Sequence, residues 1–371
     1  MKILYSCLSK SWGGMEMITI QAVQNLLNRN IETELLCYPE SKIHKAAVEH
    51  GIKVHAIKAD SYFHPFEVIK LSKIIKQNFD LIHTQASKDL WVIVPALKII
   101  SSRIPLIMTK QVGSFIIKKD FLHKWIYDRL TYALAISGII IDNLLETCPI
   151  DKERIKLLHN FVDTKKFDPS LYNSKAARKE FNIEENDVVI GMLARFSPGK
   201  GHEELLYAAK KLTQKYSNLK FLIVGEPSRG EDNYGNQIVE LSNKLDLSNH
   251  VIFTGFRSDT PFVISAMDIF AFPSHSEAFG IALIEAMAMG KASVASDANG
   301  ILDIAIDSET SLLFKNKSAE DLSDKLEQLI TSPVKREEFG KAARERAVNF
   351  FDVEFLSDKV IDIYKMALKA E

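Results

Sequence analysis

Two glutamates beside a strand-to-helix junction are the residues best placed to do chemistry. Glu277 precedes a helix-patterned segment and Glu285 lies within it, after an apolar strand-like run that ends at Phe272. The start of a helix offers free backbone N–H groups and a positive dipole end, which favour an anion, and Gly280 would let the backbone approach a phosphate closely. The two carboxylates could then accept hydrogen bonds from vicinal hydroxyls. The spacing alone also fits two ordinary acids, one in a loop and one on a helix face.

Two further strand-to-helix loops could face a phosphate. Arg195 and Lys200 lie in a glycine-containing loop, where fixed cations would suit a diphosphate leaving group. This loop is not a P-loop, because Lys200 is not followed by Ser or Thr, and exposed basic loop residues remain an alternative. Gly13 and Gly14 follow the first strand-like run, but the G-x-G-x-x-G pattern is incomplete there.

The elements that must position these residues alternate along nearly the whole chain. Continuous apolar runs of strand length predict strands buried on both faces of a parallel sheet, and their alternation with helix-period segments predicts right-handed βαβ units. The runs are 2–8, 33–38, 53–57, 81–84, 106–109, 133–136 and 155–158, then 188–193, 221–224, 251–254, 269–272, 293–296 and 311–314. We expect two doubly wound domains joined near 161–185, a polar and helix-poor stretch. Ligands of such sheets bind at the carboxyl ends of the strands, so the cleft between two domains is the expected site.

Composition narrows the function. A chain of 371 residues with 46% hydrophobic content suits two domains. The net charge of −1 disfavours a nucleic-acid partner. The three cysteines form no metal-ligand spacing, so buried free thiols at Cys7 and Cys37 and a reducing cytoplasm are expected. The longest apolar stretch, 90–100, is too short to span a bilayer, so any membrane association should be peripheral.

Basic residues are in excess in the first part of the chain. Residues 1–150 hold about 18 Lys and Arg against about 13 Asp and Glu. The excess is concentrated at Lys110, Lys118, Lys119, Lys124 and Arg129. Such a cluster is either a solvated face or a surface that approaches anionic lipid or a phosphorylated acceptor.

Taken together, these segments resemble the glycosyltransferase family 4 group of GT-B enzymes over nearly the whole chain. The sharpest element is the E-x7-E pattern of 277–285, accompanied upstream by Arg195 and Lys200. Residues 159–167 also resemble the family's inter-domain N-G-[VI]-D-x-x-x-F segment. The resemblance implies an α/β fold of two Rossmann-like, doubly wound parallel-sheet domains facing a central cleft. It divides the chain into an acceptor-side domain 1–165, a donor domain 166–350 and a helix 351–371 that crosses back to the first domain.

The resemblance also implies a reaction. Glu277 would hydrogen-bond hydroxyls of the donor sugar, while Arg195 and Lys200 would neutralise the leaving diphosphate without a metal or other cofactor. The implied activity is transfer of a hexose-type sugar, with retention at the anomeric carbon, from a UDP- or GDP-sugar to a glycan or lipid-linked acceptor. Surface polysaccharide or lipopolysaccharide assembly in the cytoplasm, at the inner face of the membrane, would be the setting.

Further donor contacts follow from the same resemblance. The amides of the helix start would hold the distal phosphate, an acid would bind the ribose, one glycine would line the phosphates from the opposite domain, and two turns would flank the nucleobase. In that order, the residues are Phe279, Gly280 and Ile281; Glu285; Gly14; and Glu226 and Phe256.

The sequence departs from the family in the first domain. Many members place a histidine in a T-x-H pattern, where this chain has Thr109-Lys110-Gln111. Gln111 could donate one hydrogen bond to the sugar or acceptor. His83 is the nearest alternative, either as a cleft residue or as a satisfied histidine at a strand end.

Two other function classes remain open at this point. A non-catalytic nucleotide-sugar or glycan-binding protein could share the fold, a reading that Gln111 favours weakly and the intact Arg195, Lys200, Glu277 and Glu285 disfavour. A nucleotide-sugar epimerase or a phosphorylase could also use two such domains. Turnover with an acceptor, or product formed from the donor alone, distinguishes these classes.

Overall fold

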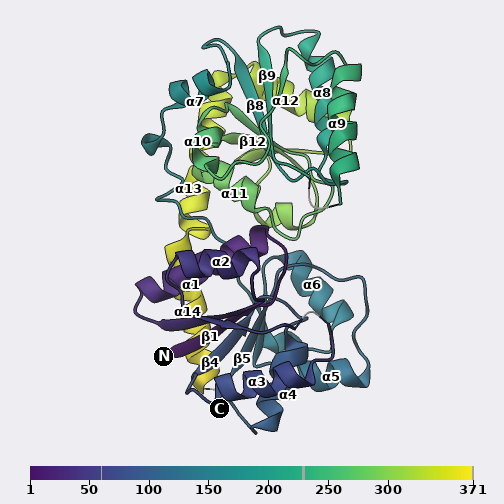
Figure 1. The fold of residues 1–371 in the computed structure, drawn as a ribbon. Coiled ribbons are helices and arrows are strands. Elements are labelled where there is room, and N and C mark those ends of the chain that lie inside the picture. Colours follow the sequence, from purple (N-terminus) through teal and green to yellow (C-terminus); the bar gives the residue numbers. More distant parts are fainter. Residues whose placement is uncertain (60, 228–229, 370–371) are drawn as a thin grey trace. The chain divides into compact units, whose positions relative to one another are not determined.

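The computed structural model describes residues 1–59, 61–227 and 230–369. The chain forms two compact units, each a parallel sheet between layers of helices (Figure 1). Met1–Asn160 and Val353–Glu371 make up the first unit, and Phe161–Asp352 make up the second. The predicted class, two Rossmann-like α/β domains, is confirmed. The divisions fall at 160/161 and 352/353, whereas the sequence placed them at 165/166 and 350/351.

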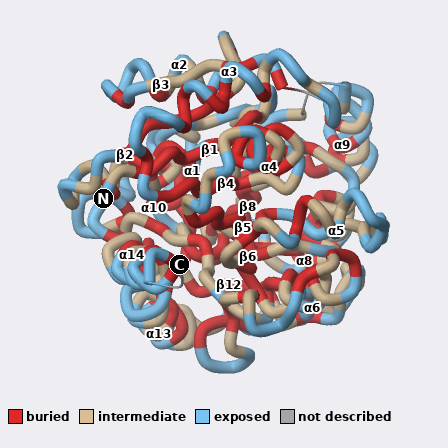
Figure 2. The backbone as a smooth tube through the Cα atoms, turned by 90° about the horizontal axis from the view of Figure 1, so that it is seen from below, coloured by how far each residue is buried: buried red, intermediate tan, exposed pale blue. Residues whose placement is uncertain are grey.

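The sheet of the first unit has seven parallel strands in the order β3-β2-β1-β4-β5-β6-β7. Successive strands are added from β1 toward β3 on one side and from β4 toward β7 on the other. The carboxyl ends of β1 and β4 therefore form a topological switch point. The strands are β1 (Lys2–Cys7), β2 (Glu32–Cys37), β3 (Val54–Ala56), β4 (Leu81–Thr84), β5 (Leu106–Lys110), β6 (Tyr132–Ala135) and β7 (Ile155–Leu157). The central strands are buried almost throughout, as their continuous apolar runs predict (Figure 2).

Helices cover both faces of this sheet. One layer contains α1, α2 and α14, with α14 packed against α1, while α3, α4 and α5 pack together in another. The helices are α1 (Gly14–Asn28), α2 (Lys42–Glu49), α3 (Pro65–Ile75), α4 (Leu90–Ile99), α5 (Phe121–Tyr127), α6 (Gly138–Thr147) and α14 (Val353–Lys369), with a 3-10 turn η1 (Lys152–Arg154). Arg29, directly after α1, pairs with Glu354 of α14 at 2.6 Å, and α14 belongs to the first unit.

The sheet of the second unit has six parallel strands in the order β10-β9-β8-β11-β12-β13. From β8 the strand order runs toward β10 on one side, and from β11 it runs toward β13 on the other. The switch point therefore lies between the neighbouring strands β8 and β11. The strands are β8 (Val188–Leu193), β9 (Leu219–Val224), β10 (Val251–Phe253), β11 (Ile269–Phe272), β12 (Ala292–Ser296) and β13 (Ser311–Phe314). The loop with Lys200 follows β8 and the loop with Glu277 follows β11, so these candidate residues follow adjacent strands.

The helices of the second unit also form two layers. One contains α8, α9 and α12, and the other α7, α10, α11 and α13 (Figure 1). Their bounds are α7 (Ser174–Glu180), α8 (His202–Thr213), α9 (Asp232–Lys244), α10 (Thr260–Ser265), α11 (Ile281–Ala288), α12 (Ala319–Ile330) and α13 (Pro333–Phe350), with 3-10 turns η2 (Pro169–Leu171) and η3 (Asn299–Asp303). The expectation of a helix-poor stretch at 161–185 is wrong over α7, which Asn173 caps by accepting a hydrogen bond from the Ala176 amide.

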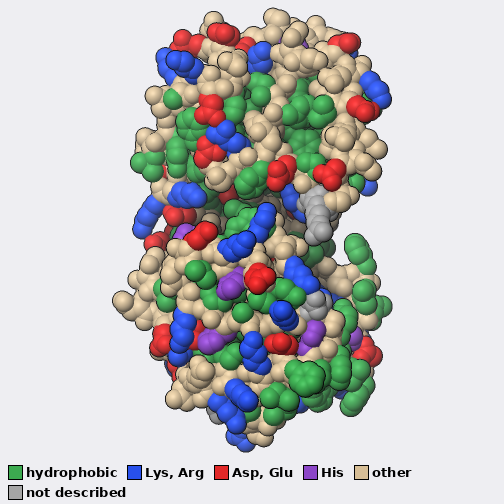
Figure 3. Space-filling view, in the orientation of Figure 1, with side chains coloured by type: hydrophobic (Ala, Val, Ile, Leu, Met, Phe, Trp, Pro, Cys, Tyr) green, Lys and Arg blue, Asp and Glu red, His purple; other side chains and the backbone are tan. Residues whose placement is uncertain are grey.

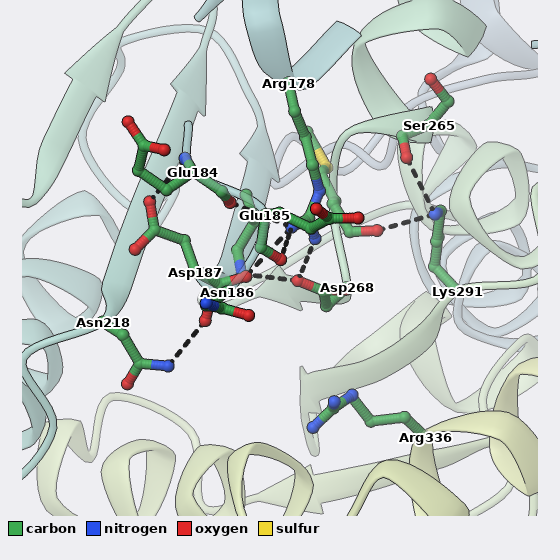
Figure 4. Close-up of polar contacts among 12 residues, drawn as sticks. Arg178, Glu184, Glu185, Asn186, Asp187, Asn218, Ser265, Asp268, Lys291 and Arg336 are labelled. Carbon is green, nitrogen blue, oxygen red and sulfur yellow. Dashed lines mark hydrogen bonds and ion pairs between the residues drawn. The ribbon is translucent and has the colours of Figure 1, made fainter. Parts of the chain in front are cut away.

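A polar cluster closes the amino ends of the second unit's strands (Figure 4). Asp268 Oδ2 accepts hydrogen bonds from the Val189 amide at 2.8 Å and from the Arg178 guanidinium at 2.6 Å. Lys291 Nζ donates to the carbonyl oxygens of Met267 and Ser265, and burial lowers the pKa of Lys291 to about 8. Because these polar groups have partners within the same unit, they stabilise the amino ends of the strands.

The sequence also predicts the state of the cysteines and the absence of a segment long enough to span a bilayer. The three cysteines are buried free thiols, as expected for Cys7 and Cys37. Within the described parts of the chain, no helix combines the length and apolar character needed to cross a bilayer.

Candidate active site

The loop between β11 and α11 presents the uncapped start of a helix. Gly280 occupies the N-cap position with φ 134°, a conformation that side-chain-bearing residues rarely adopt, and no side chain caps the helix. Ile281 is the first helical residue. The orphan N–H groups of the first turn and the positive dipole end therefore remain suited to an anion.

An ion pair joins the two loops that carry the candidate catalytic residues. Lys200 Nζ lies 2.7 Å from Glu277 Oε1, and about a fifth of each side chain is exposed, 22% and 18%. The His275 amide also donates to the Gly199 carbonyl at 2.8 Å. The structure thus brings Lys200 and Glu277 together although 77 residues separate them in the sequence.

Close backbone contact explains why these loops meet. Gly201 has φ 82°, and a Cβ atom there would lie 2.2 Å from the Pro273 carbonyl oxygen. Only glycine allows this approach. The loop before α8 consequently lies directly against the loop after β11, so the cation and the carboxylate are held by backbone rather than by long flexible side chains.

His275 is a site residue that the sequence reasoning missed. Its Nε2 atom lies 2.8 Å from Glu204 Oε1 on α8, and its carbonyl oxygen accepts a 2.8 Å hydrogen bond from Asn316 Nδ2. Directly before Glu277, the Ser276 hydroxyl accepts a 2.6 Å hydrogen bond from Asn299 Nδ2. No local sequence pattern marks His275, so only its contact with Glu204 in the fold reveals that it braces the loop.

Glu285 lies on α11, about a turn inside the helix, and is half-buried. Burial raises its pKa from 4.5 to about 7, which the positive charge of Lys166 partly offsets. Among the described residues, no hydrogen bond or ion pair is found for its carboxylate. A half-buried carboxylate without a partner is an acceptor available to a ligand.

The remaining donor-side candidates share the carboxyl edge of the second sheet. Arg195 is exposed after β8, Glu226 is exposed after β9, and Phe256 is 54% exposed after β10. Their loops are tied together through the backbone, since the Phe196 amide donates to the Glu226 carbonyl at 3.1 Å. The Phe279 side chain, in contrast, is buried against Phe351, so its backbone and not its ring is the part suited to a ligand.

In the first unit, His83 is a buried and satisfied residue. Its Nδ1 lies 2.6 Å from the Tyr364 hydroxyl and its Nε2 lies 2.7 Å from the Thr109 hydroxyl. Burial lowers its pKa to about 3, so the ring is neutral at physiological pH. Of the two alternatives for His83, the geometry favours the satisfied histidine at a strand end, which ties α14 to β4.

Gln111 is also engaged within the first unit. Its Nε2 donates to Gln85 Oε1 at 2.7 Å and to Asn160 Oδ1 at 3.2 Å, and its Oε1 accepts from Asn160 Nδ2 at 3.0 Å. Gly14 begins α1 after the extended residue Gly13, and no side chain caps that helix. The first unit thus offers an uncapped helix start at Gly14, whereas the side chains of His83 and Gln111 are already paired.

Comparisons with known proteins agree with this architecture. The sequence model described as "Glycosyltransferase Family 4" matches residues 12–166, and the model described as "Glycosyl transferases group 1" matches residues 173–346. The first match includes β2 to β7, and the second includes β8 to β13. The chain belongs to the family 4 group of GT-B glycosyltransferases.

Individual relatives differ in how much they share with this chain. The D-inositol 3-phosphate glycosyltransferase of Rhodococcus erythropolis is 29% identical over 58% of this chain and 49% of its own length, so the chain spans about half of that relative. The N,N'-diacetylbacillosaminyl-diphospho-undecaprenol alpha-1,3-N-acetylgalactosaminyltransferase of Campylobacter jejuni is 26% identical over 89% of this chain and 90% of its own. The crystal structure of a glycosyltransferase from Rickettsia africae is 25% identical, with a TM-score of 0.91 over 100% of this chain and 99% of the other.

Proposed function

We propose that this glycosyltransferase transfers a hexose-type sugar, with retention at the anomeric carbon, from a UDP- or GDP-sugar to a glycan or lipid-linked acceptor. The observation that carries the proposal is the Lys200–Glu277 ion pair beside the uncapped start of α11. It places a cation, a carboxylate and an anion-binding helix end within adjoining loops. A nucleoside diphosphate joined to a hydroxyl-rich sugar matches that set of groups.

Donor binding would exchange the partners of this ion pair. The diphosphate would take Lys200 and the first amides of α11, and Glu277 would turn to the sugar hydroxyls. Glu285, whose carboxylate has no partner among the described residues, would accept hydrogen bonds from the ribose. Phe256 and Glu226 would flank the nucleobase from the neighbouring strand ends.

The same groups favour the transition state over the bound donor. As the bond between the anomeric carbon and the diphosphate oxygen breaks, positive charge grows on the sugar and negative charge on the diphosphate. Lys200, Arg195 and the helix start then stabilise the negative charge. The acceptor oxygen bonds to the anomeric carbon from the same face, and the departing phosphate oxygen takes the acceptor proton. This scheme requires neither a nucleophilic side chain nor a metal ion.

The acceptor and the setting are part of the proposal. The Campylobacter relative, which matches along most of both chains, has an undecaprenol-linked acceptor in its name. We therefore place the reaction in surface polysaccharide or lipopolysaccharide assembly, in the cytoplasm, with the basic first unit in peripheral contact with the inner face of the membrane.

The first experiment measures thermal unfolding of the protein with UDP, GDP, ADP and CMP. A nucleotide at about 100 times its Kd adds roughly 2.7 kcal/mol to the free energy of unfolding, which shifts Tm by several degrees. We expect UDP or GDP to stabilise the protein selectively and Glu285→Gln to reduce that shift. No response to any nucleotide from a folded protein would refute the donor site.

Turnover then separates the proposed transferase from a non-catalytic binder. The paired state of Gln111 favours the binder, because that side chain has no free group for an acceptor. Incubation of the stabilising nucleotide's sugar conjugates with lipid-linked glycans, with and without EDTA, should give a product whose anomeric configuration is that of the donor. Inversion, or activity lost with EDTA, would contradict the stated mechanism; binding without product would favour the binder.

A further inference from the structure

Large apolar side chains of the first unit are exposed in two segments. One segment precedes and begins α3, and the other joins β5 to α5. Their most exposed members are Phe115 at 106%, Phe66 at 84%, Phe63 at 82% and Phe121 at 80% of full exposure, with Ile116 and Ile117 at 68% and 70%. Isolated apolar residues on a surface are ordinary, but a contiguous group of this size marks an interaction site.

The exposed segment after β5 is held by its backbone. The Ser114 amide donates to Asn143 Oδ1 at 2.9 Å, and Asn143 Nδ2 donates back to the Ser114 carbonyl at 2.8 Å. The Lys118 amide donates to the Thr147 carbonyl at 2.6 Å. Because α6 fixes both sides of 115–117, the apolar side chains point outward from an anchored loop.

The two segments adjoin through α4. The Trp91 ring on this helix contacts the rings of Tyr62 and His123, one from each segment. The distances between ring centroids are 5.3 Å and 5.2 Å, respectively. Helix α4 also packs against both α3 and α5. Figure 3 shows hydrophobic side chains gathered over this end of the first unit and along its edge. The segments 61–69 and 112–124 therefore form one surface, which we call the apolar-basic surface.

Not all of the basic cluster expected from the sequence belongs to this surface. Lys110 is buried, and Arg129 is half-buried where its guanidinium donates to the carbonyl oxygens of Ser102 and Ile104. Lys119 and Lys124 are exposed and Lys118 is partly exposed. Neither a solvated face nor a lipid-facing surface therefore includes Lys110 or Arg129. The positive charge of the apolar-basic surface comes from three lysines, and its acids are Glu67 and Asp120.

The acid closest in sequence to these lysines is already used. Asp120 caps α5 by accepting hydrogen bonds from the amides of Leu122 and His123, and it also pairs with the His123 ring. Asp120 is the single acid within 112–124, against three lysines. Lysines interleaved with aromatic and aliphatic side chains suit a partner that is both apolar and anionic, which is the composition of a bilayer surface with acidic lipids.

We propose that the apolar-basic surface docks the first unit on an anionic lipid bilayer. Phe115, Ile116, Ile117 and Phe121 would enter the boundary between headgroups and acyl chains, with Lys119 and Lys124 at the lipid phosphates. The docking loop continues directly from Gln111 at the carboxyl end of β5, so that edge of the first sheet would lie near the lipid. This inference rests on the membrane contact in the proposed function and assigns it to specific residues.

The test is co-sedimentation of the full chain with vesicles, without donor or acceptor. Vesicles of phosphatidylcholine alone are compared with vesicles that also contain phosphatidylglycerol. We expect binding to the mixed vesicles, and Lys119→Glu with Lys124→Glu should weaken it at least about tenfold. Phe115→Ser with Ile117→Ser should weaken it by a similar factor of about ten, because two buried apolar side chains are lost.

Matched controls lie in the second unit. Val334→Ser removes an apolar residue that is 65% exposed, and Lys179→Glu with Lys341→Glu reverses two exposed lysines; all should bind as the parent does. Equal binding by the surface variants and the parent would overturn the proposal. The proposal would also be overturned if the parent does not bind the mixed vesicles and instead self-associates through Phe115. The nucleotide-induced Tm shift of each variant is recorded separately, so failure of docking and failure of the donor site are distinguishable.

Discussion

The two units treat the polar groups at their strand ends in opposite ways. In the first unit, His83 and Gln111 are buried and each of their hydrogen-bonding groups has a partner from the same unit. In the second unit, Lys200 and Glu277 are partly exposed and pair with each other, and Glu285 is half-buried without a partner among the described residues. Buried pairs within the fold stabilise it, whereas a partly exposed pair can exchange its partner for a ligand. Under the proposed function, the donor would therefore engage the strand-end groups of the second unit, while His83 and Gln111 support the fold of the first.

The largest expected effect is on turnover through Glu277. Glu277→Gln keeps the shape of the side chain but removes the charge that pairs with Lys200 and the strong acceptor for sugar hydroxyls. We expect kcat/KM to fall about 100-fold, equivalent to about 2.7 kcal/mol, with little change in Tm. Steady-state kinetics of the variant check this, with Glu240→Gln, an exposed acid of α9, as the control. Parent-like turnover by a folded Glu277→Gln protein would remove Glu277 from the mechanism.

The next effect should appear in stability and not in ligand binding. His83→Phe leaves the hydroxyls of Tyr364 and Thr109 buried without their partner, which costs about 2–3 kcal/mol of the free energy of unfolding. The nucleotide-induced Tm shift should remain that of the parent. Denaturant unfolding compares this variant with His50→Phe, at an exposed histidine. A stable His83→Phe protein that has lost turnover would instead make His83 a ligand-facing residue.

The pH dependence of nucleotide binding tests Glu285. Its pKa of about 7 means that the carboxylate, the form that accepts hydrogen bonds, increases about tenfold between pH 6 and pH 8. Affinity for the nucleotide should rise by up to that factor, and Glu285→Gln should remove this part of the pH dependence. Calorimetric titration of both proteins across this range measures the two affinities. Ionisation of the nucleotide phosphate affects both proteins equally, so it cancels in the difference between their pH dependences.

The same carboxyl has an effect of opposite sign on the stability of the free protein. Burial raises its pKa above the ordinary 4.5, so in the unfolded chain it loses its proton at lower pH than in the folded protein. The unfolded state binds fewer protons between about pH 4.5 and 7, and the free energy of unfolding falls as the pH rises through this range. Comparing Glu285→Gln with the parent isolates this contribution; a variant with the parent's pH dependence would show that the group titrates normally.

The smallest expected effect concerns the brace at His275. His275→Ala removes the contact with Glu204 and loosens the loop that carries Glu277, but touches no group assigned to the donor. We expect kcat to fall about three- to fivefold with a smaller change in KM, and His275→Gln to recover part of it. A change confined to KM would indicate direct donor contact by His275.

Much of the architecture could be predicted because its signals are local. The apolar runs 269–272 and 311–314 coincide with β11 and β13, and the helix-patterned segment that contains Glu285 is α11. Helix α7 was missed, because its sequence, Ser-Lys-Ala-Ala-Arg-Lys-Glu, has little apolar periodicity and depends on the Asn173 cap. Local pattern therefore predicts buried elements well and short polar helices poorly.

The fate of individual site residues depends on distant partners. His83 is satisfied by Tyr364, 281 residues away, and His275 contacts Glu204 from 71 residues away. No pattern within a strand or helix encodes such pairs, since only the completed fold brings them together. The position of the Glu277 loop could thus be predicted, whereas the pairing of Lys200 with Glu277 could not.

The membership of α14 in the first unit has a consequence for how the protein is made. The second unit is inserted within the first, between Asn160 and Val353. During synthesis from the amino terminus, 161–352 leave the ribosome as one continuous piece and can fold as a unit. Residues 1–160 emerge earlier, yet His83 has no Tyr364 hydroxyl to bond until α14 has been translated. The unit that is begun first is therefore the one that is completed last.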